Sequence, residues 1–376
     1  MRAAMHQQGR LAQHWNLDVL EHAPSWFVRL YRDGYLATVR RLPWVVGAGY
    51  ARSDLPLRSH SAMGRAVARA EDAILKRFRS LDCLREADAV VSTHFLASSV
   101  LARMRQRGQL QAKLVTVITD EHPHAIWLHA GSDLTCVASK TARMAAIQRG
   151  LDPARVVVTG IPVDPSFCML TQRASPADAD ERQHHVLLCG GGHGLGCMQQ
   201  AAQSLLAQLQ TQRLHARVTV VCGRNSTLQR ALLHDRDAAG VGQDRFTIVG
   251  FTDVMHQLMA SATLLVGKPG GLTCTEAMAM GLPMLMLKPI PGQEERNAQA
   301  LEGAGAAIRL ADARQVGAEA VRVLTHPLVL RSMRAAAAAT GKPRAAFDVA
   351  HHVAVLAQGA ALATADCLVR QKSASW

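Results

Sequence analysis

Two glycine-rich segments in the second half of the chain have the composition of phosphate-binding loops. The segment GGGHGLG, residues 190–196, follows an apolar run at residues 186–189 and precedes a helical pattern. Glycines let the backbone approach a ligand closely, and a helix N-terminus offers free N–H groups to an anion. This context predicts a diphosphate site, and a tight turn without a ligand is the alternative.

The second segment is GKPGGLTCTEA, residues 267–277, which also follows an apolar run. We expect a helix to begin near Thr273 and to carry Glu276 in its first turn, where its carboxylate suits two ribose hydroxyls. The alternative is a capping box, because Thr273 and Glu276 have the S/T-x-x-E spacing.

A third segment, KPIPGQEERN at residues 288–297, follows a predicted strand at residues 283–287. Gln293 and Glu294 offer donors and acceptors for sugar hydroxyls. A solvated start of a helix would explain the same residues.

The first half offers titratable side chains in a loop after a predicted strand at residues 114–118. These are Asp120, His122 and His124, with His94 after residues 90–93 as a weaker candidate. Such groups can act as a general base. Binding an acceptor or holding the loop are equally compatible roles.

Alternating apolar runs and helical patterns must position these loops, and they predict α/β architecture with parallel sheets. The expected strands are residues 89–92, 114–118, 134–138, 156–159, 186–188, 217–222, 246–249, 264–266 and 283–287. The expected helices are residues 97–107, 140–148, 199–212, 226–237, 254–261 and 273–279.

This alternation predicts two doubly wound domains, with ligands at the carboxyl ends of the strands. We expect an N-terminal domain at residues 1–165, a linker at 166–184 and a second domain at 185–349. A C-terminal helix, within residues 350–376, is expected to pack back on the first domain.

The composition is that of an ordered globular protein, with 49% hydrophobic and 19% charged residues among 376. Eight scattered cysteines without a CxxC pair indicate neither a zinc site nor a redox motif. We expect no signal peptide, no transmembrane span and a cytoplasmic protein. The net charge of +13 predicts an anionic partner, and without a nucleic-acid-binding motif we expect a membrane surface or nucleotide phosphates rather than nucleic acid.

Aromatic and basic residues are mixed near the N-terminus. Residues 15–50 hold three of the five tryptophans and all three tyrosines, and residues 1–60 hold eight arginines against four acids. Such mixtures suit the headgroup region of an anionic bilayer, although some of these rings could be ordinary core. The residues expected to contact membrane or acceptor are Trp26, Tyr31, Tyr35, Arg40, Arg41 and Trp44.

Several of these segments resemble one family, the diacylglycerol glycosyltransferases. The strings GKPGGLTCTEAMAMGLPML and PIPGQEERNAQALEGAGAA resemble its donor domain, and YRDGYLATVRRLPWVVGAGY and VTVITDEHPHAIWLHAGSDLTCVAS resemble its N-terminal half. The family comprises monogalactosyl- and glucosyl-diacylglycerol synthases and is related to the cell-wall N-acetylglucosaminyl transferase. The resemblance covers most of the chain, with distinct motifs in order.

The resemblance implies a GT-B fold, two Rossmann-like domains facing a cleft, and inverting hexosyl transfer from a UDP-sugar without a required metal or cofactor. It implies diacylglycerol or a related lipid as acceptor, at the inner face of the cell membrane. The donor residues that it implies are Gly191, Gly192 and Gly194 at the diphosphate, Phe251 and Thr252 at the uracil, Gly271, Leu272 and Thr273 at the phosphates, Glu276 at the ribose, and Gln293 and Glu294 at the sugar.

In this family a histidine in a Gly-Gly-His loop after the first strand is the general base, and the chain departs from that pattern. Its first residues, MRAA, resemble those just after that histidine. We expect the first strand and its loop to be missing and the native protein to start upstream. Otherwise the base would be recruited elsewhere, with Asp120 and His124 as candidates.

Three other functions remain open from the sequence. One is a transferase acting on a polyprenyl-linked cell-wall intermediate, and another is a UDP-N-acetylglucosamine 2-epimerase, which the aromatic and basic segment disfavours. The third is a catalytically inactive UDP-sugar-binding protein, because the Gly-Gly-His loop is absent. Which sugar is used is left undecided by the sequence.

Overall fold

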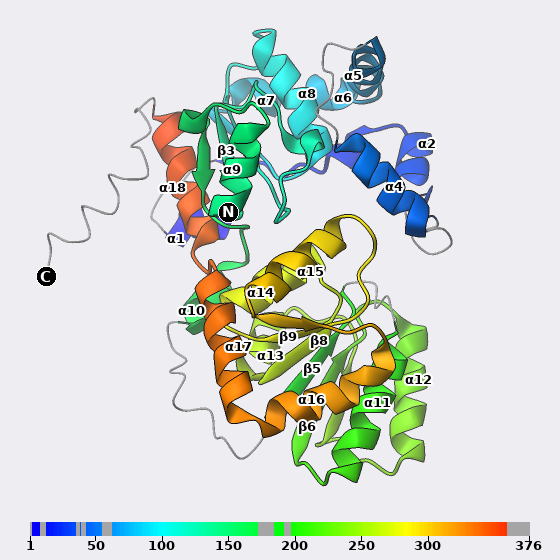
Figure 1. Ribbon diagram of the computed structural model, residues 1–376. Helices are drawn as coiled ribbons and strands as arrows, with labels where there is room; N and C mark the ends of the chain where they lie inside the picture. The colour runs from blue at the N-terminus through cyan, green and yellow to red at the C-terminus, as the bar shows by residue number, and fades with distance from the viewer. Residues whose placement is uncertain are drawn as a thin grey trace, which may run out of the picture. The chain divides into compact units, whose positions relative to one another are not determined.

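The computed structural model describes residues 2–7, 13–34, 38, 43–54, 62–171, 184–191 and 197–358. The described residues form two compact units (Figure 1). The first contains those up to Pro162 together with those from Arg344 onward, and the second extends from Val163 to Pro343.

The first unit is built on a parallel four-stranded sheet in the order β1-β2-β3-β4. Its strands are β1 (Ala89–Ser92), β2 (Lys113–Val117), β3 (Leu134–Val137) and β4 (Val156–Val158). Helix α8 (Phe95–Gln106) connects β1 to β2, and α9 (Lys140–Gln148) connects β3 to β4. Its shorter segments are η3 (Ala125–Trp127) and η4 (Pro153–Arg155).

The C-terminal helix α18 (Ala345–Ala357) returns to this sheet. Val349 and Val353 pack in one cluster with Val115 and Val117 of β2, while Leu114, whose side chain points the other way, packs with α8. On α18, Ala346 and Ala350 pack with Ala4 of the N-terminal helix α1 (Arg2–Gln7). The two ends of the described chain therefore meet in one unit.

The remaining elements of the first unit are short helices before β1. They are η1 (Val19–His22), α2 (Ser25–Val28), η2 (Arg29–Gly34), α4 (Pro43–Ser53), α5 (Ala62–Ile74), α6 (Lys76–Arg79) and α7 (Asp82–Glu86).

The second unit holds a parallel six-stranded sheet in the order β10-β9-β8-β5-β6-β7. Its strands are β5 (His184–Cys189), β6 (Ala216–Val221), β7 (Phe246–Val249), β8 (Leu264–Gly267), β9 (Met284–Met286) and β10 (Ala307–Arg309). Its helical segments are α10 (Pro165–Thr171), α11 (Met198–Thr211), α12 (Ser226–Ala238), α13 (Met255–Ser261), α14 (Gly271–Ala279), α15 (Gln293–Gly303), η5 (Ala313–Gln315), α16 (Val316–Thr325) and α17 (Pro327–Thr340).

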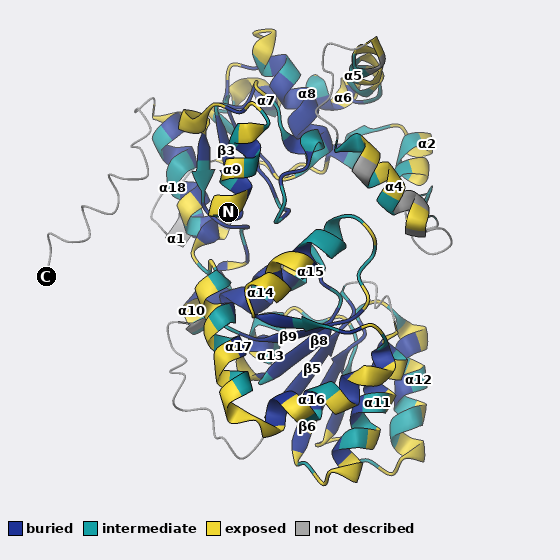
Figure 2. Cartoon of the chain, viewed as in Figure 1, coloured by how far each residue is buried: buried dark blue, intermediate teal, exposed yellow. Residues whose placement is uncertain are grey.

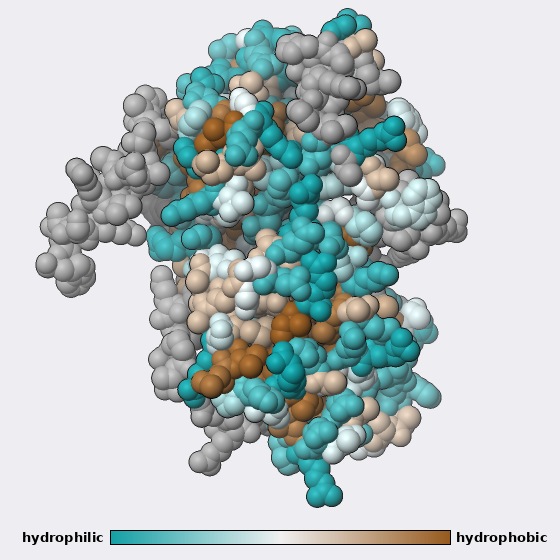
Figure 3. All heavy atoms as spheres, viewed as in Figure 1, coloured by the Kyte–Doolittle hydropathy of each residue, from teal (hydrophilic) through white to brown (hydrophobic). Residues whose placement is uncertain are grey.

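Helices cover both faces of this sheet because alternate strand residues point to opposite sides. On β5, Val186 and Leu188 pack with α11 and α16, whereas Leu187 and Cys189 pack with α13, α14 and α15. The strands are buried and the outer faces of the helices are exposed (Figure 2). On the side drawn in Figure 3, apolar side chains lie among hydrophilic ones over α16 and α17.

The observed strands and helices confirm the expected alternation, with differences at their ends, and they add β10, α16 and α17, which the sequence pattern did not indicate. Residues 166–184 were expected to be a linker, but α10 occupies Pro165–Thr171; residues 172–183 lie outside the described part. The last helix begins at Ala345, before the expected boundary at residue 349. Helix α14 begins at Gly271 rather than near Thr273, because Gly270 is already its extended N-cap residue.

Candidate functional site

The loops that the sequence singles out in the second half all follow the carboxyl ends of strands in one sheet. Along the edge of that sheet, the loops after β9, β8, β5, β6 and β7 follow one another in this order. Neighbouring strands lie about 4.8 Å apart, so the five loops span roughly 19 Å. This edge is the usual ligand-binding edge of a doubly wound sheet.

Glycines shape the two central loops. Gly191 has a φ of +72°, which favours glycine, and a Cβ on Gly267 would lie 2.4 Å from the carbonyl oxygen of Cys189 on the neighbouring strand. Larger residues would therefore disturb the point where β5 and β8 end. Gly192 and Gly194, also predicted to bind a diphosphate, lie outside the described residues.

The N-terminus of α14 is presented without a side-chain cap. Gly270 is the N-cap residue and makes no side-chain hydrogen bond, and Leu272 is 61% exposed. The N–H groups of Gly271, Leu272 and Thr273 have no partner one turn earlier in the helix. Together with the helix dipole, they make this end suitable for an anion.

Glu276 lies in the second turn of α14, not in the first turn as expected. The capping box is not formed, because Thr273 is the third residue of the helix and not its N-cap. Burial raises the pKa of Glu276 to about 7, and the nearby charge of Asp164 adds to this effect. A carboxyl group that titrates near neutrality is typical of a functional site.

The third segment forms the start of α15, after Gly292 with a φ of +112°. Gln293 and Glu294 are its first two residues. The Oε2 atom of Glu294 accepts a hydrogen bond from the Ile290 N–H at 2.7 Å, which holds the preceding loop. Burial raises the pKa of Glu294, and this hydrogen bond partly opposes the increase.

At the other end of this edge, Phe251 follows β7 and is 59% exposed. The guanidinium of Arg224, in the loop after β6, lies 5.2 Å from the centre of the Phe251 ring. The hydroxyl of Thr252 accepts a hydrogen bond from the Val254 N–H at 3.2 Å. An exposed ring and a cation thus stand side by side at the ends of two neighbouring strands.

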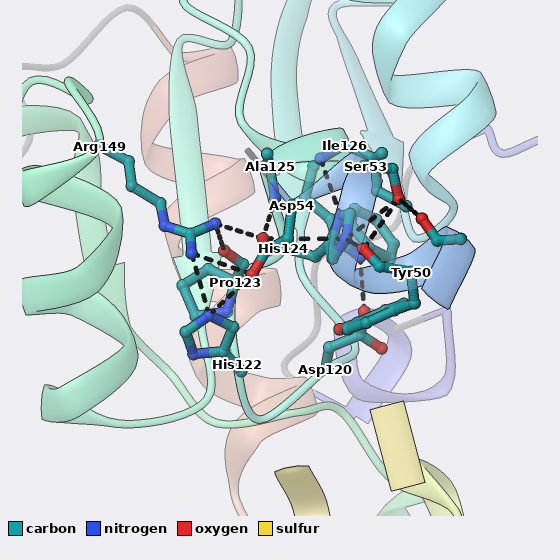
Figure 4. Close-up of polar contacts among 12 residues, drawn as sticks. Tyr50, Ser53, Asp54, Asp120, His122, Pro123, His124, Ala125, Ile126 and Arg149 are labelled. Carbon is teal, nitrogen blue, oxygen red and sulfur yellow. Dashed lines mark hydrogen bonds and ion pairs between the residues drawn. The ribbon is translucent and has the colours of Figure 1, made fainter. Parts of the chain in front are cut away.

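In the first unit, the loop after β2 carries Asp120, His122 and His124 (Figure 4). His124 is fully buried, and its Nδ1 accepts a hydrogen bond from the Ile126 N–H at 3.2 Å. Its Nε2 therefore carries the proton and donates to the carbonyl of Tyr50 at 2.9 Å. Both ring nitrogens are bonded to the backbone, which favours the loop-holding alternative for His124.

Asp120 is 8% exposed, and its Oδ2 accepts a hydrogen bond from the indole N–H of Trp127 at 2.7 Å.

An ion pair lies at the same loop. Arg149 binds both carboxylate oxygens of Asp54, at 2.5 and 3.1 Å, and the carbonyl of Pro123 at 3.2 Å. Asp54 directly follows α4. This ion pair, which sequence reasoning missed, joins the end of α4 to the loop and to the end of α9.

The aromatic residues near the N-terminus divide into two groups. Trp26 and Trp44 are 57% and 68% exposed. Tyr31 instead stacks on Phe27 with ring centres 5.5 Å apart and lies near Phe95, so it belongs partly to the core. Tyr35, Arg40 and Arg41 lie outside the described residues.

Sequence reasoning also gave no separate role to Asn297 on α15. It is completely buried, and its Nδ2 donates to the carbonyl of Pro269, in the loop before α14, at 3.0 Å. The available signal was its spacing of four residues from Gln293, which places both on one face of a helix.

Neither a metal-binding cluster nor a membrane span occurs in the described part of the chain. No group of three or more His, Cys, Asp or Glu side chains there could hold a metal ion. No helix within the same residues is long and apolar enough to cross a membrane.

Comparisons with known proteins match two separate parts of the chain. Residues 1–163 match the family model described as monogalactosyldiacylglycerol (MGDG) synthase, and residues 185–351 match the glycosyltransferase family 28 C-terminal domain. The chain is 31% identical over 288 residues to a probable monogalactosyldiacylglycerol synthase 2 from Oryza sativa subsp. japonica, across 74% of this chain and 60% of the rice protein. It is 29% identical over 278 residues to a processive diacylglycerol beta-glucosyltransferase from Bacillus mycoides, across 73% of this chain and 69% of that protein.

Among solved structures, the chain resembles a putative UDP-N-acetylglucosamine 2-epimerase from Listeria monocytogenes. The TM-score is 0.54 at 16% identity, across 78% of this chain and 79% of that one. The expected fold of two Rossmann-like domains, GT-B, is therefore confirmed. At this identity the likeness concerns the fold alone.

Proposed function

Since the chain belongs to the monogalactosyldiacylglycerol synthase family of glycosyltransferases, we propose that it transfers a hexose from a UDP-sugar to diacylglycerol or a related lipid. The observation that carries this proposal is the row of loops at one edge of the second sheet. It combines glycine turns, an uncapped helix N-terminus, a titratable carboxyl group and amide and acidic side chains.

The two ends of this row of loops suit the two ends of an extended nucleotide sugar. The loops after β7 and β6, with Phe251 and Thr252, would hold the uracil, and Glu276 the ribose. The loop after β5, with Gly191, Gly192 and Gly194, and the start of α14, with Gly271, Leu272 and Thr273, would hold the diphosphate. Gln293 and Glu294 at the start of α15 would bind the hexose hydroxyls.

In the proposed reaction, the acceptor hydroxyl oxygen attacks the anomeric carbon of the hexose as the bond from that carbon to the diphosphate oxygen breaks. UDP leaves with the bonding electron pair, and the configuration at the anomeric carbon is inverted. The N–H groups at the start of α14 would stabilise the charge on the departing diphosphate, without a metal ion or other cofactor.

The proton of the acceptor hydroxyl must pass to a base. Of the two catalytic candidates, we assign this role to Asp120. Its carboxylate can accept a proton, whereas His124 uses Nδ1 as an acceptor and Nε2 as a donor within the fold. Trp127 would then orient the carboxylate through its indole N–H.

A lipid acceptor implies work at a membrane surface, and we propose peripheral attachment at its cytoplasmic face. The exposed rings of Trp26 and Trp44 and the net charge of +13 support this proposal. Rings of this kind insert at headgroup depth, and cations meet lipid phosphate.

The test is a product analysis with the full chain, radiolabelled UDP-glucose or UDP-galactose, and vesicles containing diacylglycerol. We expect a labelled glycolipid with inverted anomeric configuration, formed equally well after treatment with EDTA. Product only with a polyprenyl-linked acceptor would instead identify a cell-wall transferase. UDP binding without any transfer would identify a binding protein and contradict the proposed activity.

A further inference from the structure

The loop between β8 and α14 is held by one side chain from another helix. The four carbonyl groups from Gly267, the last residue of β8, to Gly270 each accept a hydrogen bond. Gly267 accepts from the Leu287 N–H, Lys268 from the Gly270 N–H, and Gly270 from the Cys274 N–H. The carbonyl of Pro269 accepts instead from the Nδ2 atom of Asn297, at 3.0 Å.

Asn297 has no exposed surface, and Pro269 is buried as well. The Oδ1 atom of Asn297 has no hydrogen-bond partner among the residues that the structure describes. A buried amide with one unpaired oxygen is a poor choice for stability alone, because burying an unpaired acceptor is costly. Its hydrogen bond to the loop therefore explains why an amide side chain occupies this buried position.

Asn297 also connects two parts of the edge described above. It lies one helical turn after Gln293 on α15, so both residues are on the same side of that helix. The carbonyl that it binds belongs to the residue directly before Gly270, the N-cap of α14. The amide thus fixes the start of α14 relative to the start of α15.

We propose that Asn297 is a positioning residue that places the N-terminal N–H groups of α14 against the diphosphate of the donor. This inference rests on the proposed function of the same edge. Asn297 does not touch the donor itself. It acts through the Pro269 carbonyl, and its effect is confined to ligands that carry the diphosphate.

The test measures the affinity of uridine, UMP and UDP for the wild-type chain and for Asn297→Ala. We expect the affinity for UDP to fall about tenfold, equivalent to about 1.4 kcal/mol, while the affinity for uridine stays within about twofold. Gln299→Ala, which removes an exposed side chain from the same helix, is the matched control and should leave all three affinities unchanged.

A second variant, Asn297→Leu, fills the buried site with an apolar side chain that cannot donate a hydrogen bond. It therefore separates the loss of the hydrogen bond from the effect of the cavity that Ala would leave. Thermal unfolding reports whether each variant is folded. An unchanged affinity for UDP, or an equal loss for uridine and UDP in a folded variant, would overturn the inference. Failure of both variants to fold would assign Asn297 a purely structural role. Failure of the wild-type chain to bind UDP would instead contradict the proposed function.

Discussion

The carboxyl group of Glu276 gives the proposed donor site a dependence on pH. Burial raises its pKa to about 7, and Asp164 adds to the increase. The ionised carboxylate of Glu276 accepts hydrogen bonds from two ribose hydroxyls better than the protonated form does. Below pH 7, donor binding must therefore release a proton from Glu276. We expect the affinity for UDP to rise by up to about tenfold per pH unit below pH 7 and to level off above it.

Isothermal titration in buffers of different ionisation enthalpy measures this proton release directly. Glu276→Gln, which cannot ionise, should bind UDP more weakly at pH 8 and lose the proton release that Glu276 contributes near pH 7. An unchanged pH profile in this variant would show that another group is responsible.

The structure distinguishes the two catalytic candidates, Asp120 and His124, by their hydrogen bonds, which the sequence could not do. We expect Asp120→Asn to reduce the transfer rate by at least about 100-fold, because it removes the proposed base. The affinity for UDP should remain that of the wild type. Transfer assays and UDP titrations on the same preparation provide both values, and transfer at near the wild-type rate would exclude Asp120 as the base.

At the scale of elements, the ion pair between Asp54 and Arg149 joins the end of α4 to the rest of the first unit. Burial alone would raise the pKa of Asp54, but the hydrogen bonds from Arg149 and the Ala125 N–H outweigh it and lower the pKa to about 2. Because this value lies below the ordinary 3.8, the pair stabilises the folded chain above pH 3.8. Its contribution is lost as the pH falls toward 2.

We expect Asp54→Asn to lower the free energy of unfolding by about 3 kcal/mol at pH 7, because Arg149 would keep a partly buried charge without its partner. Urea denaturation measures this loss. Asp82→Asn, in an ion pair whose side chains are 71% and 81% exposed, is the control and should change stability by less than about 0.5 kcal/mol. Equal losses in the two variants would contradict the proposed fastening.

The elements also show what the sequence could predict. Apolar runs indicated β1 to β9 within one or two residues, as at residues 89–92, because buried parallel strands have a continuous apolar pattern; the short β10 was missed. The donor-side loops could be placed because each directly follows such a strand. No local sequence pattern indicates the contact of Asp54 with Arg149, 95 residues away, or that of Asn297 with Pro269. Tertiary packing also decided that His124 is a buried donor to Tyr50.

At the scale of the whole molecule, net charge and exposed aromatic rings make separate contributions to membrane binding. The charge of +13 attracts the chain to anionic lipid, and this attraction is screened by salt. Insertion of Trp26 and Trp44 would instead be insensitive to salt. We therefore expect strong binding to vesicles rich in anionic lipid at low salt, and weak residual binding at 0.5 M salt, a chosen condition about threefold above physiological ionic strength.

Vesicle sedimentation with the double variant Trp26→Ala and Trp44→Ala separates the two contributions. Because the variant keeps the charge and loses the rings, it should still bind at low salt but lose the residual binding at high salt. Leu328→Ala, which removes a side chain 79% exposed in the second unit, is the matched control and should behave as the wild type. If the tryptophan variant kept its binding at high salt, the rings would not be the inserting groups, and the lipid acceptor would have to be reached through another surface.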